Sequence, residues 1–124
     1  YELEMFQVQY GNANIPTATV SLKTPEGKTV QTACTGNGSV EALYKTIGEL
    51  INEDSKLLDY KISSIGGGKD ALAEAYVKVD VNEVFNARGT ASDVLEASAR
   101  AYINAVNKYI IQKNSLKIKE ATTI

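Results

Sequence analysis

The sequence predicts an α+β fold of two pseudo-symmetric β-β-β-α units packed together, with antiparallel sheets and two main helices. In each half of the chain, stretches of alternating apolar and polar residues precede a stretch with helical periodicity. The loop-to-helix junction GNGSVEA at residues 36–42 has a counterpart about 55 positions later, TASDVLEA at residues 90–97. A single unit would expose one face of its sheet, so we expect the two units to bury these faces against each other around a pseudo-twofold axis.

The first unit, about residues 3–52, begins with three predicted strands. Residues 3–10 and 16–23 alternate in polarity, and the apolar side chains predicted on one face are Phe6, Val8 and Tyr10, then Ala18, Val20 and Leu22. The run TPEG at residues 24–27 combines a proline and a glycine at turn spacing, which predicts a hairpin into the third strand, KTVQTACT.

The helix of this unit begins near Ser39, where the apolar period changes. One stripe is predicted to face the core, made of Val40, Leu43, Ile47, Leu50 and Ile51. Ser39 is a predicted N-cap, and Glu41 lies in the first turn, where the helix dipole favours an acid. The polar run NEDSK ends the helix.

The second unit, about residues 56–112, repeats this order. Strands are predicted in LLDYKISSI, in ALAEAYVKVDV and in EVFNARG, with GGGKD as a flexible connection between the first two. The middle strand should place its small apolar residues on one side: Ala71, Ala73, Ala75, Val77, Val79 and Val81.

The second helix is predicted from about Asp93 to about Gln112. Asp93 followed by Glu96 fits a reciprocal capping box, with Asp in place of the usual Ser or Thr. The predicted buried stripe comprises Val94, Leu95, Ser98, Ala101, Tyr102, Ala105 and Tyr109. We therefore expect one domain over residues 1–112, followed by a polar, frayed tail at residues 113–124.

Composition excludes several classes of function. The formal net charge is −2 and the lysines are dispersed among acids, so no basic stripe exists for nucleic acid. No apolar run approaches the length of a membrane span, and no signal region is recognisable, which predicts a cytoplasmic protein without membrane contact. The chain has no His, the commonest general base and transition-metal ligand. Cys34 is expected to be a reduced core residue, and the start at Tyr1 suggests a piece of a longer protein.

The first junction has the composition of a small anion site. A helix start preceded by glycines offers unshielded backbone amides and a partial positive charge. The other interpretation is a tight strand-to-helix turn with no ligand, and spacing alone does not separate the two.

Other patterns do not complete a site. IGGGKDA has Asp70 where a P-loop requires Ser or Thr, and GNGSVE lacks the third glycine of a dinucleotide fingerprint. The acidic pairs are at surface positions, and no Ser or Cys has a base beside it, so no catalytic residues and no metal site are predicted. Tyr60 is amphipathic enough to line a pocket, although a core position would also suit it.

Four segments carry a family resemblance. VQYGNANIPTATVSL, TGNGSVEALYKTI, LLDYKISSI and ASDVLEASARAYINAVNKYI resemble the C-terminal allosteric domain of 2-isopropylmalate synthase over residues 3 to about 111. The resemblance implies a feedback-regulatory domain that forms a homodimer and binds L-leucine. It also implies an upstream catalytic TIM barrel that handles a divalent metal, acetyl-CoA and 3-methyl-2-oxobutanoate. This chain contains none of that barrel, so we expect no enzyme activity and no cofactor in it.

The resemblance places the leucine site at both junctions and on the strands between them. The matching positions are Gly36, Asn37, Gly38, Val40, Ala42, Leu57, Tyr60, Ser64, Ala71 or Ala73, Ala91, Ser92 and Asp93. Chemistry supports this placement, because amides near Gly38 suit a carboxylate, Asp93 suits an ammonium group and the alanines suit a branched side chain. Ser39, where many relatives have Pro, and Ala91, in a loop often richer in Gly, depart from the family pattern.

Two alternatives remain open from the sequence. The related domain of citramalate synthase would bind isoleucine instead of leucine. The chain could also serve only in dimerisation, without an effector site.

Overall fold

The computed structural model describes residues 1–68 and 71–122. Its elements, in chain order, are β1 (Glu2–Gly11), β2 (Asn14–Lys23), β3 (Thr29–Thr35), α1 (Ser39–Leu50), β4 (Lys56–Ile65), β5 (Leu72–Val81), β6 (Glu83–Ala91) and α2 (Val94–Thr122). The strands form two antiparallel three-stranded sheets, ordered β1-β2-β3 and β4-β5-β6. The predicted α+β fold of two β-β-β-α units is confirmed.

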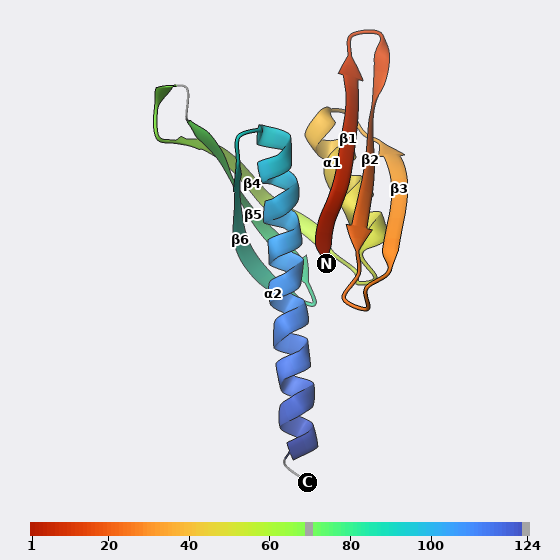
Figure 1. Ribbon diagram of the computed structural model, residues 1–124, viewed down its shortest axis with the longest axis vertical. Helices are drawn as coiled ribbons and strands as arrows, with labels where there is room; N and C mark the ends of the chain where they lie inside the picture. The colour runs from red at the N-terminus through yellow and green to blue at the C-terminus, as the bar shows by residue number, and fades with distance from the viewer. Residues whose placement is uncertain (69–70, 123–124) are drawn as a thin grey trace.

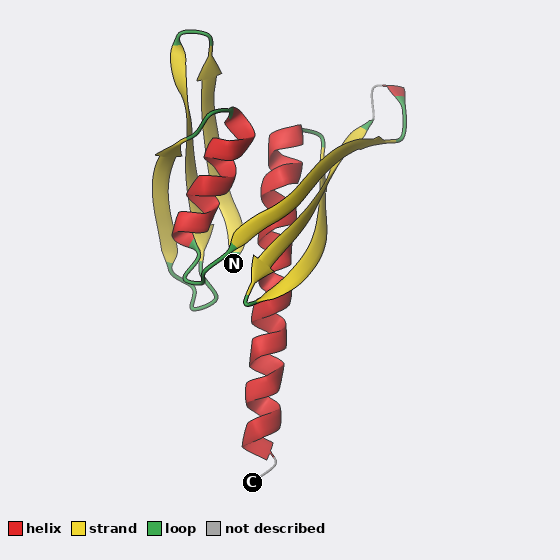
Figure 2. Cartoon of the chain, turned by 180° about the vertical axis from the view of Figure 1, so that it is seen from behind, coloured by secondary structure: helices red, strands yellow, loops and turns green. Residues whose placement is uncertain are grey.

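The two units are joined through their helices. The helix α1 packs on β2 and β3, α2 packs on β5 and β6, and the two helices contact each other. Both helices begin at the upper end of the molecule in Figure 1, where the β1–β2 and β4–β5 hairpins project. Seen from behind in Figure 2, the C-terminal half of α2 extends below both sheets. The two junctions therefore lie at the same end of the fold.

The core is formed by the middle strand of each sheet and the facing sides of the helices. As predicted, the alternating apolar residues of β2 and β5 are fully buried: Ala18, Val20, Leu22, Ala75, Val77, Val79 and Val81. Leu43 and Ile47 of α1 are fully buried against them. Tyr10, predicted on the inner face of β1, is instead 69% exposed because it lies at the tip of the projecting hairpin.

Both helix starts differ from the prediction in detail. Ser39 is the first residue of α1 and Gly38 occupies the N-cap position, so Ser39 is not the cap. Val94, predicted in the buried stripe of α2, is 42% exposed. As the first residue of its helix, Val94 precedes the turn that packs on the sheet.

The helix α2 does not end near Gln112. It continues to Thr122, so the expectation of a frayed tail is wrong for residues 113–122. No Gly or Pro occurs in this segment, and once the buried first turns have nucleated a helix, each further residue adds a hydrogen bond at little cost. An ion pair of 2.8 Å between Lys113 Nζ and Glu53 Oε1 ties the extension to the loop after α1. Within the described residues, no helix has both the length and the apolar character to span a membrane.

Substitution by alanine at two glycines that lie at helix contacts should change the free energy of unfolding in opposite directions. A Cβ at Gly89 would lie 2.5 Å from both Ala101 N and Ala97 O of α2, so Gly89→Ala should lower the free energy of unfolding by about 1–3 kcal/mol. A Cβ at Gly48, inside α1, would meet only Tyr102 Oη, at an ordinary 3.6 Å. Because glycine destabilises a helix interior relative to alanine, Gly48→Ala should raise the free energy of unfolding by about 0.5–1 kcal/mol. Urea denaturation measures both, and a destabilised Gly48→Ala would contradict the described contact between the helices.

Candidate functional site

The start of α1 is open because its N-cap residue has no side chain. Gly38 has an extended backbone (φ −158°, ψ 174°), and no side chain caps the helix. The first helical hydrogen bond runs from Ala42 N to Gly38 O at 3.0 Å, so the amides of residues 39–41 have no acceptor within the helix. A Cβ added at Gly38 would meet no heavy atom within 4 Å. The fold therefore does not require a glycine here, and the space beside it is open.

Gly36 has a different role from Gly38. A Cβ at Gly36 would lie 2.5 Å from Ala42 N, and its own amide donates to Pro16 O at 3.0 Å. Ala42 is fully buried behind this contact, whereas Asn37 is exposed and Val40 is half-buried. Gly36 and Ala42 thus position the junction by packing. For these two residues the structure agrees with the interpretation of the motif as a tight strand-to-helix turn without a ligand.

The start of α2 is closed by its own carboxylate. Asp93 Oδ2 accepts a hydrogen bond from Glu96 N at 3.0 Å, which confirms the predicted cap. The reciprocal half of the capping box is wrong, since the Glu96 carboxylate lies 3.6 Å from Arg100 Nε instead of returning to Asp93. Ser92 beside it is exposed. The two junctions are therefore chemically unequal: α1 offers amides and α2 offers a carboxylate.

Three predicted site residues form one row across the second sheet. Ser64 of β4 pairs with Ala73 of β5, and Ala73 pairs with Ala91 of β6. Ala91 is 8% exposed and leads directly into the α2 junction. Ala71 lies outside β5, next to the undescribed residues 69–70, and is exposed. Of the two alanines considered for this wall, the structure favours Ala73.

Tyr60 belongs to a cluster of three tyrosines between the helices. Its ring meets Tyr44 of α1 edge-on, with 5.4 Å between centroids, and Tyr44 in turn lies 5.3 Å from Tyr102 of α2. The Tyr60 hydroxyl pairs with Ser98 Oγ at 3.1 Å, and the Tyr102 hydroxyl pairs with Ser55 Oγ at 2.6 Å. Tyr60 thus lies at the contact between units, where it touches the second turn of each helix through Tyr44 and Ser98.

Tyr44 differs from Tyr60 and Tyr102 in the hydrogen bonding of its hydroxyl. It is 6% exposed, and its hydroxyl has no hydrogen-bond partner among the described residues. Burial raises the pKa of the Tyr44 hydroxyl far above its ordinary value, and the nearby Ser98 hydroxyl opposes part of that rise without meeting hydrogen-bond geometry. Burial also raises the pKa of Tyr102, an effect that Ser55 partly offsets. Both side chains stay neutral at physiological pH.

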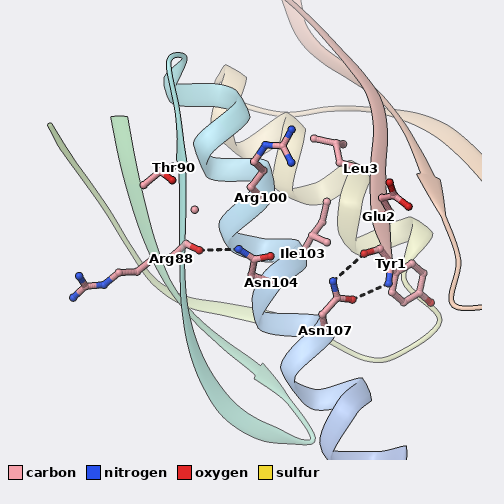
Figure 3. A pocket seen from close by; sticks show the side chains of 10 residues that line it. Tyr1, Glu2, Leu3, Arg88, Thr90, Arg100, Ile103, Asn104 and Asn107 are labelled. Carbon is pink, nitrogen blue, oxygen red and sulfur yellow. Dashed lines mark hydrogen bonds between the residues drawn. The ribbon is translucent and has the colours of Figure 1, made fainter. Parts of the chain in front are cut away.

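Two cavities lie along the contact between the units. One, of about 320 Å³, is drawn in Figure 3 between the start of β1, the end of β6 and α2. Asn104 Nδ2 donates to Arg88 O at 2.8 Å on its floor, and Asn107 Nδ2 donates to Tyr1 O at 2.9 Å at its side. The other, of about 480 Å³, runs along α1 and includes Leu57, Tyr44 and Tyr102. Neither cavity is lined by residues of both junctions.

The structure thus brings the predicted residues together in two groups. Gly38 and Val40 mark the open end of α1, while Ser64, Ala73 and Ala91 form a row across the second sheet that leads to Asp93 at the start of α2. Tyr60 contacts Tyr44 and Ser98 instead of either group, and Leu57 lines the cavity along α1. Sequence reasoning missed Tyr44, although it follows Val40 by four residues and so shares its side of the helix. It placed Ser98 in a buried stripe without identifying Tyr60 as its hydrogen-bond partner.

The architecture defines a class of α+β domains built by internal duplication of a β-β-β-α unit. A family model described as the LeuA allosteric (dimerisation) domain matches residues 1–110. The chain belongs to this family.

Several curated relatives are named 2-isopropylmalate synthase. The protein from Geobacillus thermodenitrificans is 54% identical over 99% of this chain, and the one from Oceanobacillus iheyensis is 53% identical over 93% of it. A third, from a Geobacillus species (strain WCH70), is 57% identical over 87%. The chain spans only 24%, 22% and 21% of these relatives, respectively. It therefore corresponds to a small part of each.

Buried Tyr44 should make the chain less stable at alkaline pH. The ordinary pKa of a tyrosine is 10.0, and burial raises that of Tyr44, so the unfolded chain loses this proton at lower pH than the folded chain. Below pH 10 both states keep the proton, and above it the free energy of unfolding falls as pH rises. Urea denaturation from about pH 8 to about pH 11 should show a smaller fall in Tyr44→Phe than in the unmodified chain. Tyr10→Phe, which removes an exposed hydroxyl, is the control, and equal slopes in all three would contradict the described burial.

Proposed function

We propose that this chain is the leucine-binding, feedback-regulatory and dimerisation domain of a 2-isopropylmalate synthase. The observation that carries the proposal is the uncapped start of α1, where Gly38 leaves open space beside three amides without helical acceptors. The family description and the names of the relatives support an allosteric role in this enzyme. Leucine is the end product that such a domain would sense.

The two unequal junctions suit the two charged ends of an amino acid. The carboxylate would bind the amides of residues 39–41, assisted by the positive end of the α1 dipole. Asp93 would accept from the ammonium group while it also caps α2. Ala73 and Ala91 form a small apolar wall against which a branched side chain could pack.

Regulation would follow from a preference of leucine for one arrangement of the two units. The helices α1 and α2 contact each other. The affinity of a ligand bound between their starts would therefore depend on how the two units are placed. A ligand shifts such an equilibrium only by its differential affinity for the two arrangements. The shift would be transmitted to a catalytic barrel in the same protein.

The chemistry of the whole protein is part of the same proposal. We infer a cytoplasmic acyltransferase that joins acetyl-CoA to 3-methyl-2-oxobutanoate with a divalent metal in its barrel. Among residues 1–68 and 71–122, no group of three or more metal-ligating side chains is placed to hold an ion. Following the family resemblance, we assign the metal and acetyl-CoA to the barrel, and the isolated chain should release no CoA in the synthase assay.

Gly38→Val tests the site by calorimetry with L-leucine. The added side chain enters open space, so the fold should persist, but a β-branched group beside the amides should weaken binding at least tenfold, about 1.4 kcal/mol. Gly67→Val, in another open position on the β4–β5 hairpin, is the matched control and should bind as the unmodified chain does. Sedimentation should show the same dimer for all three proteins.

The outcome distinguishes the alternatives. Tighter binding of L-isoleucine than of L-leucine would favour the citramalate synthase type of domain. A folded dimer that gives no heat with leucine, isoleucine or valine would reduce the function to dimerisation alone.

A further inference from the structure

The Tyr44 hydroxyl is a buried polar group that packing does not explain. Buried polar groups in folded proteins nearly always have a hydrogen-bond partner. Tyr44 is only 6% exposed, and its hydroxyl has no hydrogen-bond partner among the described residues. A phenylalanine would fill the same space without this penalty. The hydroxyl therefore lacks a partner, which the described residues do not supply.

The neighbouring hydroxyls show which kind of partner is missing. Ser98 Oγ donates its one hydrogen to Val94 O at 2.7 Å, so in the 3.1 Å contact with Ser98 the Tyr60 hydroxyl is the donor. Tyr102 and Ser55 satisfy each other at 2.6 Å. Ser98 Oγ also lies near the Tyr44 hydroxyl, but that contact does not meet hydrogen-bond geometry, so the Tyr44 hydroxyl makes no hydrogen bond within the described residues. The missing partner is an acceptor, and a carboxylate oxygen is the strongest one in an amino acid.

Tyr44 is also placed close to the uncapped amides. It follows Val40 by four residues, one helical turn, on the same side of α1. Side chains in a helix lean toward its N-terminus, so the phenol covers the turn that begins at residues 39–41. Its ring rests edge-on against Tyr60, at 5.4 Å between centroids. The Tyr44 hydroxyl and the uncapped amides therefore belong to neighbouring turns of α1, about one helical pitch apart.

We propose that the Tyr44 hydroxyl donates a hydrogen bond to the carboxylate of the bound amino acid and thereby selects ligands with a free carboxylate. This inference rests on the proposed function and adds a residue that contacts the ligand from the side of α1. It gives the binding site a donor from a side chain in addition to those from the backbone. The hydroxyl is left unsatisfied in the free chain and is satisfied when the ligand arrives.

Two phenylalanine variants test the proposal through stability and affinity together. Tyr44→Phe removes a hydroxyl without a partner, so the Tm of the ligand-free chain should stay the same or rise. Its Kd for L-leucine should weaken about tenfold, and its much weaker Kd for L-leucinamide, which lacks the carboxylate, should change less than twofold. Tyr102→Phe is the matched control: it leaves Ser55 unpaired, so Tm should fall while the Kd for leucine stays within about twofold.

The results separate failure of this inference from failure of the proposed function. An unmodified chain that does not bind leucine would end the proposed function, and the inference with it. If the unmodified chain binds leucine and Tyr44→Phe binds equally well, only the inference is overturned. It is also overturned if Tyr44→Phe lowers Tm as far as Tyr102→Phe does, because the hydroxyl would then already have a partner in the free chain.

Discussion

The contact between α1 and α2 around Tyr44 joins the two units, and the candidate site depends on it. Tyr44 belongs to the first unit, and its ring lies 5.4 Å from Tyr60 and 5.3 Å from Tyr102 of the second. Aromatic pairs at such distances contribute about 0.5–1.5 kcal/mol each beyond the area they bury. This contact holds both helix starts at one end of the molecule (Figure 1). The candidate site exists only because the two units are joined in this way.

The two β-β-β-α units have helix starts with opposite chemistry. In the first, Gly38 leaves the amides uncapped, and in the second the Asp93 carboxylate caps its own helix. A strictly symmetric pair would offer two donors or two acceptors. The unequal pair instead matches a zwitterion, with positive potential at α1 and a negative charge at α2. In the proposed function, this small difference between the units would turn a repeated scaffold into an asymmetric binding site.

The strands and helices could be predicted from periodicity, because the central strands β2 and β5 bury one face each and leave a clean alternation. The end of α2 could not, since no stop residue marks it and propagation of a nucleated helix carries it to Thr122. The exposed position of Tyr10 depends on how far a hairpin projects, which alternation does not encode. Gly36, where an added Cβ would collide with Ala42, and Gly38, where an added Cβ would meet no heavy atom within 4 Å, can be told apart only in three dimensions.

The central claim is that the uncapped start of α1 receives the carboxylate of a small branched amino acid. A crystal structure of the chain grown with L-leucine tests it most directly. We expect the carboxylate oxygens within hydrogen-bond distance of the amides of residues 39–41, with Asp93 still bonded to the Glu96 amide. Leucine bound elsewhere, or those amides engaged by other protein groups, would contradict the account.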